Sequence, residues 1–388
     1  MNQPEPSKLA RAGRILAAVV MCSVGAAILA FAARHNTQRT DFISYWAAGR
    51  QLAHRLNPYD GAAILHIQEQ AGYTAGRPFF MRNPPWALFL ALPLGFVPPV
   101  LGSFLWSCGL IFALMGSVAL FWARLGSHDD NLRLMSYAWA PAAICLLQQQ
   151  MSLFLLFGLV LFFYLLESRP FLAGAALLIP ALKPHLLLPF WIVLLLWVLT
   201  RRRYAVLRGF AAAFAIALAI GFLLEPHCFQ DYVAMVRIAD IANDFIPSIA
   251  QLLRLLIQPR WAWLQLVPAA SACCWALWYF VSRRTEWNWI EHGPVVLLVS
   301  VMTAPYAWFP DQSVLLIAAM AGLHRAANNR KAVVLFLVFA IAAFIQILWS
   351  GEVRSFWLVW TTPVWLLWYL YATRAAAAQL VAAKPVST

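Results

Sequence analysis

A few ionisable residues stand out in a chain of 388 residues, of which only 11% are charged. Asp41 stands at the start of a stretch with helical spacing, where a carboxylate is able to take a proton from a hydroxyl group. Arg82 precedes Asn83-Pro84-Pro85, and Lys183-Pro184-His185 forms a second polar turn. Arginine and lysine bind phosphate, the first through paired hydrogen bonds and the second as a point charge. Which chemistry the chain uses depends on the elements that position these side chains.

Each candidate also has a purely structural interpretation. Asp41 follows Thr40 at a predicted helix start, where Asp is a common N-cap. Lys183 is able to extend its ammonium towards lipid headgroups. Gln150 is equally suited to a hydrogen bond between helices, and Asp311 to capping a helix that begins at the next residue. The residue types alone therefore leave both interpretations open.

The composition indicates a polytopic membrane protein. Of all residues 63% are hydrophobic, and the mean hydropathy is +0.72. Soluble domains contain roughly 45–50% apolar and about 25% charged residues, and a single water-soluble core stops growing at roughly 250–300 residues. With about 20 residues per crossing, the apolar content predicts about twelve transmembrane helices. A soluble enzyme, a nucleic-acid-binding domain and a disordered chain are excluded.

Twelve apolar segments are predicted to cross the membrane, the first within residues 15–33. The others lie near 100–122, 134–149, 151–167, 170–182, 186–200, 204–224, 262–281, 292–309, 312–323, 332–350 and 355–371. With both termini in the cytoplasm, this threading places most basic residues, including Arg201-Arg202-Arg203, on the cytoplasmic side, as the positive-inside rule requires. The net charge of +13 is thus explained by topology rather than by a nucleic-acid partner. We expect one membrane domain over 1–374 and a flexible cytoplasmic tail over 375–388.

A long outer loop, residues 34–99, follows the first segment. Residues 41–56 place aromatic side chains on one helical face and polar ones on another, which predicts a helix lying in the membrane interface. Residues 86–97 predict a second interfacial element that is too short to cross. We expect the large aromatic residues of this loop to form an interfacial belt; they are Tyr45, Trp46, Tyr59 and Trp86.

Three of the predicted segments, 134–149, 170–182 and 312–323, are shorter than the roughly 17 residues that a crossing needs. Their outer turns are polar, and they contain Gln148-Gln149-Gln150, Lys183-Pro184-His185 and Pro310-Asp311-Gln312. Polar, non-helical backbone persists at membrane depth only where it lines a cavity or is buried in protein. We therefore expect a cavity that opens outwards, with these turns as its floor and the first loop as its roof.

Several short motifs occur in order along most of the chain. In the first loop they are Asp41-Phe42, Tyr45-Trp46, Ala48-Gly49-Arg50 and Asn57-Pro58-Tyr59-Asp60. Later motifs are Pro84-Pro85, Pro93-Leu94, Leu105-Trp106, Gln150 with Leu153, Ala173-Gly174 to Lys183-Pro184, Asn243 to Ser248, and Pro305-Tyr306 to Asp311. In this order they resemble family 87 glycosyltransferases. The sequence departs from the family pattern at Asn83, where an aromatic residue is usual, and at Gln149 and Ser152, which replace Gly and Asn. The 308–311 segment also lacks the Trp-acid-His pattern of the mannosyltransferase branch.

This resemblance implies an all-α, GT-C-like bundle of about 11–12 transmembrane helices. It implies transfer of a hexose, with mannose as the first choice, from a polyprenyl-phosphate donor to a lipid or glycan acceptor on the outer side of the cytoplasmic membrane. Asp41 is then the catalytic base, and Arg82, Lys183 and His185 bind the donor phosphate. The remaining substrate-binding candidates are Tyr45, Asp60, Gln150 and Asp311. We expect no metal site and no cofactor besides the lipid-linked donor.

Two other functions are compatible with the sequence. A transporter or lipid flippase also has short, broken spans and charged residues at membrane depth. It predicts two matching halves, whereas the polar turns of this chain all lie on the outer side and no second half mirrors the first loop. A non-catalytic membrane scaffold predicts that Asp41 is dispensable. The sequence favours the transferase, then the transporter, then the scaffold.

Overall fold

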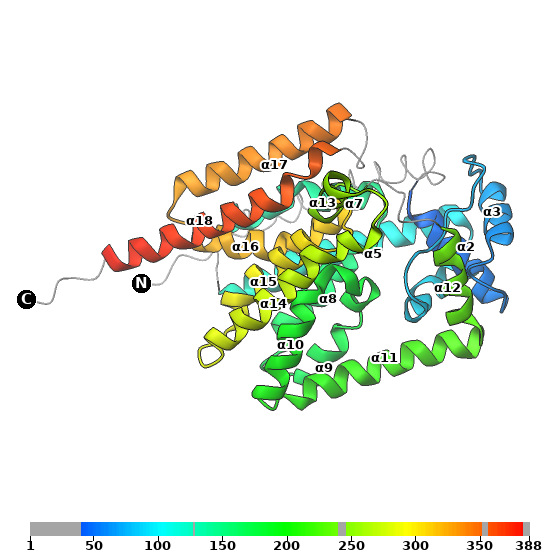
Figure 1. The fold of residues 1–388 in the computed structure, drawn as a ribbon, viewed down its shortest axis with the longest axis horizontal. Coiled ribbons are helices and arrows are strands. Elements are labelled where there is room, and N and C mark those ends of the chain that lie inside the picture. The colour runs from blue at the N-terminus through cyan, green and yellow to red at the C-terminus, as the bar shows by residue number, and fades with distance from the viewer. Residues whose placement is uncertain (1–39, 127–128, 240–245, 351–355, 383–388) are drawn as a thin grey trace, which may run out of the picture.

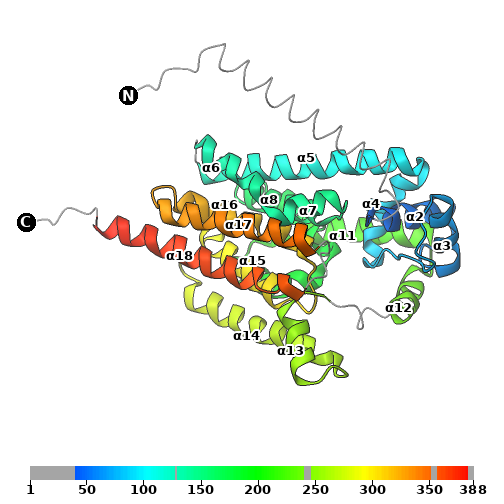
Figure 2. The same ribbon diagram turned by 90° about the horizontal axis from the view of Figure 1, so that it is seen from above.

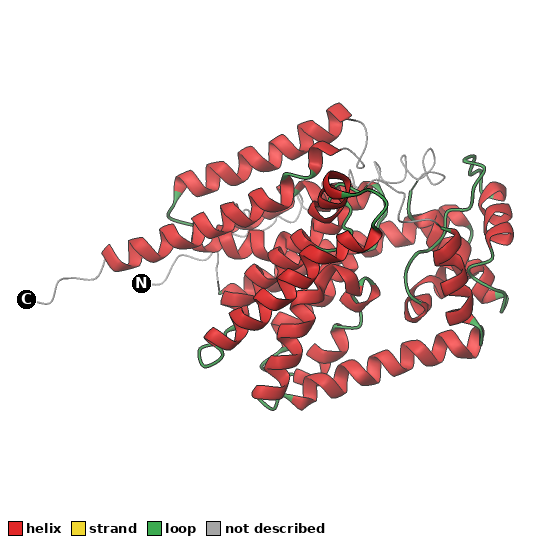
Figure 3. Cartoon of the chain, viewed as in Figure 1, coloured by secondary structure: helices red, strands yellow, loops and turns green. Residues whose placement is uncertain are grey.

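The computed structural model describes residues 40–126, 129–239, 246–350 and 356–382, and every regular element in these ranges is a helix (Figure 3). The elements of the first loop are α2 (Phe42–Ala53), α3 (Gly61–Gln70), η1 (Pro85–Ala87), α4 (Leu88–Ala91) and η2 (Leu92–Phe96). The first half of the bundle contains α5 (Pro99–Leu125), α6 (Asp130–Met135), η3 (Ser136–Ala138), α7 (Ala140–Leu147), α8 (Ser152–Leu165), α9 (Pro170–Ala176), η4 (Pro180–Leu182), η5 (Pro184–Leu187), α10 (Leu188–Thr200) and α11 (Tyr204–Leu224). The second half contains α12 (Cys228–Ile238), α13 (Ile249–Ile257), η7 (Ala262–Gln265), α14 (Leu266–Arg283), α15 (Trp289–Thr303), η8 (Phe309–Leu315), α16 (Leu316–Arg325), α17 (Arg330–Ser350), η9 (Phe356–Leu358) and α18 (Thr361–Ala382).

The apolar segments predicted from residue 100 onwards are all occupied by helices, whereas the first, 15–33, lies outside the described residues. The flexible cytoplasmic tail over 375–388 stays a prediction; within the described residues, α18 continues past residue 375 to Ala382. Residues 375–378 are all alanine. Alanine has the highest helix propensity of any residue, so this run extends the helix instead of ending it.

Four helices of the described part are long and apolar enough to cross a membrane, namely α5, α11, the η7–α14 segment Ala262–Arg283, and α17. A fifth candidate is the pair Pro170–Leu182 and Pro184–Thr200, whose two arms are bent by 115°. The number is lower than the eleven to twelve expected, in part because segment 15–33 lies outside the described residues and in part because several apolar helices are short. The 14 residues of α8, for example, extend about 21 Å against a hydrocarbon thickness of about 30 Å. The protein is an all-α polytopic membrane protein in which long spans surround shorter helices.

The first loop differs from the predicted pair of interfacial elements. Ten of the twelve residues of α2 are buried, and Ser44 and Gln51 on its expected polar face are only 3% and 5% exposed. The helix packs closely against η2, because a Cβ on Gly95 of η2 would collide with the Gly49 carbonyl oxygen. The loop thus packs on the bundle as well as on itself, and this packing buries the polar face of α2 in protein.

The predicted interfacial belt is also wrong for three of its four aromatic residues. Tyr45, Trp46 and Tyr59 are 4%, 7% and 4% exposed. Trp46 donates its indole N–H to the Val97 carbonyl oxygen at 2.9 Å. Tyr45 packs on Trp106 of α5 and Tyr59 on Tyr232 of α12, with ring centroids 5.1 and 5.6 Å apart. The loop thus buries these side chains against neighbouring helices instead of presenting them to the membrane interface.

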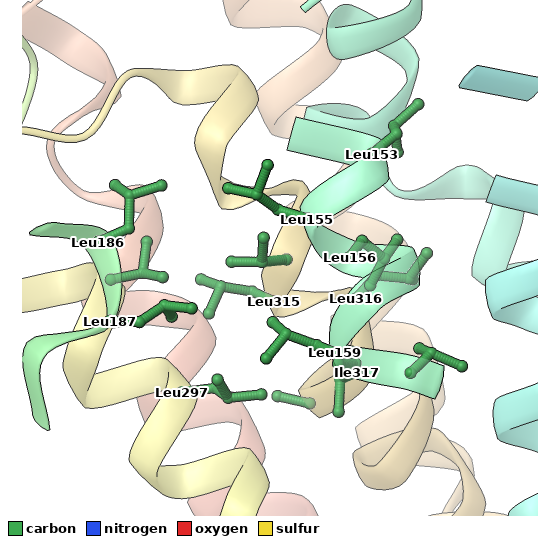
Figure 4. Packing of buried hydrophobic residues seen from close by; sticks show 14 of the residues in the cluster. Leu153, Leu155, Leu156, Leu159, Leu186, Leu187, Leu297, Leu315, Leu316 and Ile317 are labelled. Carbon is green, nitrogen blue, oxygen red and sulfur yellow. The ribbon is translucent and has the colours of Figure 1, made fainter. Parts of the chain in front are cut away.

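The core of the bundle is centred on α8. Its leucine residues pack against η5, α15 and the η8–α16 junction (Figure 4). The side chains drawn there include Leu155, Leu186, Leu297 and Leu315, all buried. This apolar cluster holds together the elements on which the polar turns stand.

Two views show how the elements are arranged. In Figures 1 and 2 the first loop and α12 lie at one end of the molecule. In Figure 1, α11 runs from the region of α9 and α10 to α12. The α9–α11 contact is very close, because a Cβ on Gly174 would lie 1.9 Å from the Val206 carbonyl oxygen.

Candidate active site

A cavity of about 1110 Å³ lies between the first loop and the polar turns of the bundle. The sequence predicted a cavity in this place, with these turns as its floor. Its lining includes seven of the eight residues singled out from the sequence, which are Asp41, Tyr45, Arg82, Gln150, Lys183, His185 and Asp311. Residues that are far apart in the chain thus face one shared space.

Asp60 is the exception and does not line this cavity. Its carboxylate accepts hydrogen bonds from the backbone N–H groups of Ala62 and Ala63, at 3.0 and 3.2 Å. It is therefore the N-cap of α3, a structural task for which Asp is well suited.

The floor of the cavity is built around an ion pair between Lys183 and Asp311. The Lys183 ammonium donates to Asp311 Oδ1 at 2.7 Å, and the two side chains are 12% and 1% exposed. Ser152 and Gln150 donate to the same oxygen at 2.6 and 3.2 Å. The backbone N–H of Trp308 donates to the other oxygen, Oδ2, at 2.9 Å. The Asp311 carboxylate thus accepts four hydrogen bonds from three different parts of the chain.

These contacts determine the charge of Asp311. Burial by itself raises the pKa of the carboxyl group, because it disfavours the charged form. The Lys183 ammonium and the hydrogen bonds from Ser152 and Trp308 outweigh burial, so the pKa lies below its usual range. Asp311 is therefore an anion at neutral pH.

Lys183 lies where the chain breaks between two helical arms. Helix breaks leave backbone carbonyl groups without partners inside the helix, and such groups are costly at membrane depth. Here Asn83 donates its side-chain N–H to the Leu182 carbonyl oxygen at 3.1 Å, and Trp86 donates to that of Ala181 at 2.9 Å. The Asn83-to-Trp86 segment of the first loop therefore stabilises the bend on which Lys183 stands.

Asp41 comes from the first loop, directly before the first residue of α2. The interpretation of Asp41 as an ordinary cap does not hold, because its side chain makes no capping hydrogen bond to α2. Its backbone N–H donates to the Gln148 carbonyl oxygen at 3.0 Å. Burial raises the pKa of the nearby Tyr45 hydroxyl well above its usual range, and the charges of Asp41 and Asp311 act in the same direction. Tyr45 thus lies within the electrostatic reach of both carboxylates.

A third group of lining residues contains Arg82 and an aromatic pair. His185 stacks on Tyr306 with the ring centroids 3.9 Å apart. The Nε2 atom of His185 is buried and has no hydrogen-bond partner among the described residues. Arg82 also lines the cavity, and its backbone carbonyl oxygen accepts a hydrogen bond from the Tyr232 hydroxyl at 3.5 Å. Among the described residues, no group of three His, Cys, Asp or Glu side chains comes together that could hold a metal ion.

Sequence reasoning missed several residues that build the site. Ser152 entered only as a departure from a family pattern, Asn83 and Gln149 as departures and as parts of polar turns, and Trp86 as a belt residue. Tyr306 was noted only as part of a motif. The available signal was the polarity of Ser152 and Asn83 beside predicted helix breaks, where buried carbonyl groups need donors.

The comparison with protein families adds an independent observation. The family model of glycosyltransferase family 87 matches residues 80–305, which is more than half of the 388-residue chain. The chain belongs to glycosyltransferase family 87. Arg82, Gln150, Lys183 and His185 lie within the matched part of this family 87 member. No curated protein and no solved structure matches the chain.

The family assignment decides among the three functions considered from the sequence. Family 87 proteins are glycosyltransferases, so this one transfers a sugar from a donor to an acceptor. Its apolar helices make it a membrane-embedded transferase. The transporter and scaffold interpretations are therefore set aside.

Proposed function

We propose that this family 87 glycosyltransferase moves a hexose, with mannose as the first choice, from a polyprenyl-phosphate donor to a lipid or glycan acceptor. The reaction takes place at the outer face of the cytoplasmic membrane, in a fold of the GT-C type. The observation that supports the proposal is the placement of Asp41, Arg82 and Lys183 on one cavity of about 1110 Å³. That volume slightly exceeds the range of about 300–1,000 Å³ that is typical of ligand pockets, and it suits a donor sugar phosphate together with an acceptor group.

Asp41 is the general base in this proposal. An acceptor hydroxyl oxygen attacks the anomeric carbon, the bond from that carbon to the phosphate oxygen breaks, and its electron pair leaves with the phosphate. The hydroxyl proton goes to the Asp41 carboxylate. Phosphate is a good leaving group that needs little protonation, so one base suffices. Such a base contributes about 10²–10⁴-fold to the rate, and the transition state has oxocarbenium character, as in other glycosyl transfers.

Lys183 and Arg82 bind the departing phosphate. An ammonium group has three N–H donors, of which Asp311 and Ser152 accept two. The third is available to a phosphate oxygen in the cavity. Arg82 is able to offer two parallel N–H groups to the same phosphate. Together the two cations stabilise the negative charge that develops on the leaving group.

The remaining lining residues have supporting roles. His185 offers a buried ring nitrogen beside Tyr306 for a hydrogen bond to the phosphate or the sugar. Tyr45 and Gln150 are placed to contact substrate hydroxyl groups. Asp311 orients Lys183, because its oxygens already accept four hydrogen bonds. No metal or additional cofactor takes part in this scheme.

The test of the proposal is transfer by Asp41→Asn. Membranes that contain the full chain are incubated with labelled polyprenyl-phosphate hexoses, and the products are identified. We expect the variant to insert normally and to lose transfer by about 10²–10⁴-fold. Asp129→Asn is the matched control, since Asp129 caps α6 and Asn is an equally good N-cap. Full transfer by Asp41→Asn contradicts the assignment of the base.

A further inference from the structure

Gln149 has an unusual backbone conformation and contacts Thr40, the residue that precedes Asp41. Its backbone has a φ of 53°, in the left-handed region, which is costly for any residue other than glycine. Its side chain is nevertheless buried, and both its amide oxygen and its amide nitrogen form hydrogen bonds. Gln149 Oε1 accepts a hydrogen bond from the Thr40 hydroxyl at 2.7 Å. Its Nε2 lies 2.7 Å from the hydroxyl groups of both Ser103 and Ser107.

The contacts of Gln149 connect the first loop to the longest span. Ser103 and Ser107 belong to α5, a helix of 27 residues. Trp106 of the same helix donates its indole N–H to the Gln149 carbonyl oxygen at 2.8 Å. These hydrogen bonds hold the side-chain amide of Gln149 against α5, and the bond to Thr40 in turn holds Thr40 in place.

The turn around Gln149 also determines the spacing of the two walls of the cavity. The Gln148 carbonyl oxygen accepts a hydrogen bond from the backbone N–H of Asp41 at 3.0 Å. The side-chain oxygen of Gln149 accepts one from the hydroxyl of Thr40. On the other side of the turn, Gln150 donates to Asp311 at 3.2 Å, and Asp311 holds Lys183. Residues 148–150 thus connect the segment that contains Asp41 to the ion pair between Lys183 and Asp311.

We infer that Gln149 is a positioning residue that fixes Asp41 relative to Lys183, through its hydrogen bond to Thr40. This inference rests on the proposed function, because it takes Asp41 as the base. Positioning acts on the chemical step, and a displacement of about 1 Å can cost 10²-fold in rate. The donor-binding cations stay in place when this bond is lost, so the effect falls on kcat rather than on the KM for the donor.

The test uses Gln149→Gly, Thr40→Val and Thr40→Ser in the full chain, with polyprenyl-phosphate mannose as the donor. Glycine relieves the left-handed backbone at position 149, so folding is preserved while the hydrogen bond to Thr40 is lost. We expect kcat to fall about 10–100-fold in Gln149→Gly and Thr40→Val, with the donor KM changed less than about threefold. Thr40→Ser keeps the hydroxyl and should retain most of kcat. Thr200→Val, which changes an exposed threonine in the last turn of α10, is the matched control and should act as wild type.

Three outcomes overturn the inference. The first is a wild-type kcat in both Gln149→Gly and Thr40→Val. The second is a loss in Thr40→Ser as large as in Thr40→Val, which would make the hydroxyl irrelevant. The third is a rise in donor KM that accounts for the whole loss. Asp41→Asn separates this failure from failure of the proposed function: if that variant is inactive while Gln149→Gly is fully active, only the positioning role is wrong.

Discussion

Lys183 and Asp311 form an ion pair that bears both on the stability of the fold and on the proposed binding of phosphate. Both charges are largely withdrawn from water, so each depends on the other for compensation. Removing one partner of a buried ion pair commonly costs about 3–5 kcal/mol, whereas replacing both partners by neutral groups costs much less. The pair therefore has a structural role that a single substitution cannot distinguish from a role in binding phosphate.

A double-mutant cycle separates these roles. We expect Lys183→Met and Asp311→Asn each to lower the thermal stability of the protein in detergent. The double variant should recover much of that loss, because no unpaired charge remains. Its KM for the donor should stay raised, since the phosphate cation is still missing. Recovery of donor binding together with stability would show that Lys183 serves the fold alone.

At the level of elements, the site depends on a break between two helical arms. The arms Pro170–Leu182 and Pro184–Thr200 meet at 115°, with Lys183 between them. The first loop satisfies the carbonyl groups of Ala181 and Leu182 through Trp86 and Asn83. Substitutions in this loop should therefore alter the geometry of a lysine about a hundred residues away in sequence.

Asn83→Leu and Trp86→Phe test this connection. Asn83→Leu leaves a buried carbonyl group unsatisfied, which costs about 1–3 kcal/mol. Trp86→Phe keeps an aromatic ring but loses one hydrogen bond, which costs about 1 kcal/mol. We expect both to lower the melting temperature and to raise the KM for the donor. Trp278→Phe, at a tryptophan of α14 that is 62% exposed, is the control. Equal changes in melting temperature and donor KM in all three variants would show that Asn83 and Trp86 do not stabilise the bend at Lys183.

At the scale of the whole molecule, the cavity and the basic turns lie at opposite ends of the helices. From Pro184 at the cavity, η5 and α10 lead to Arg201-Arg202-Arg203, and the 13 residues of α10 alone extend about 20 Å. Positive charge at the turn favours the cytoplasmic side. On this rule we expect the cavity, formed where the first loop meets the polar turns, to face outwards, as the proposed function requires.

Cysteine labelling tests this orientation in intact cells. In a variant whose six native cysteines are replaced, Ala62→Cys on the exposed side of α3 should react with a membrane-impermeant maleimide. Thr285→Cys, in the exposed turn between α14 and α15, should react only after permeabilisation. The reverse pattern would invert the topology and place the cavity on the cytoplasmic side.

The sequence by itself determined the class of the protein and most of its helices. Apolar composition and the spacing of polar turns are local properties, and they predicted the membrane fold, the broken segments and seven of the residues that line the cavity. Partners were not predictable in this way. Lys183 and Asp311 are 128 residues apart, and only the packing of broken helices around α8 brings them within 2.7 Å.

The tertiary structure also decided between the two interpretations that the residue types left open for Asp41. Asp60 and Asp41 both precede helices in the same loop, yet only Asp60 caps its helix. The burial of α2, and with it of Tyr45 and Trp46, depends on how the first loop folds on α5 and η2. A hydrogen-bond partner or a buried face is determined by the relative position of whole elements, which local sequence patterns do not encode.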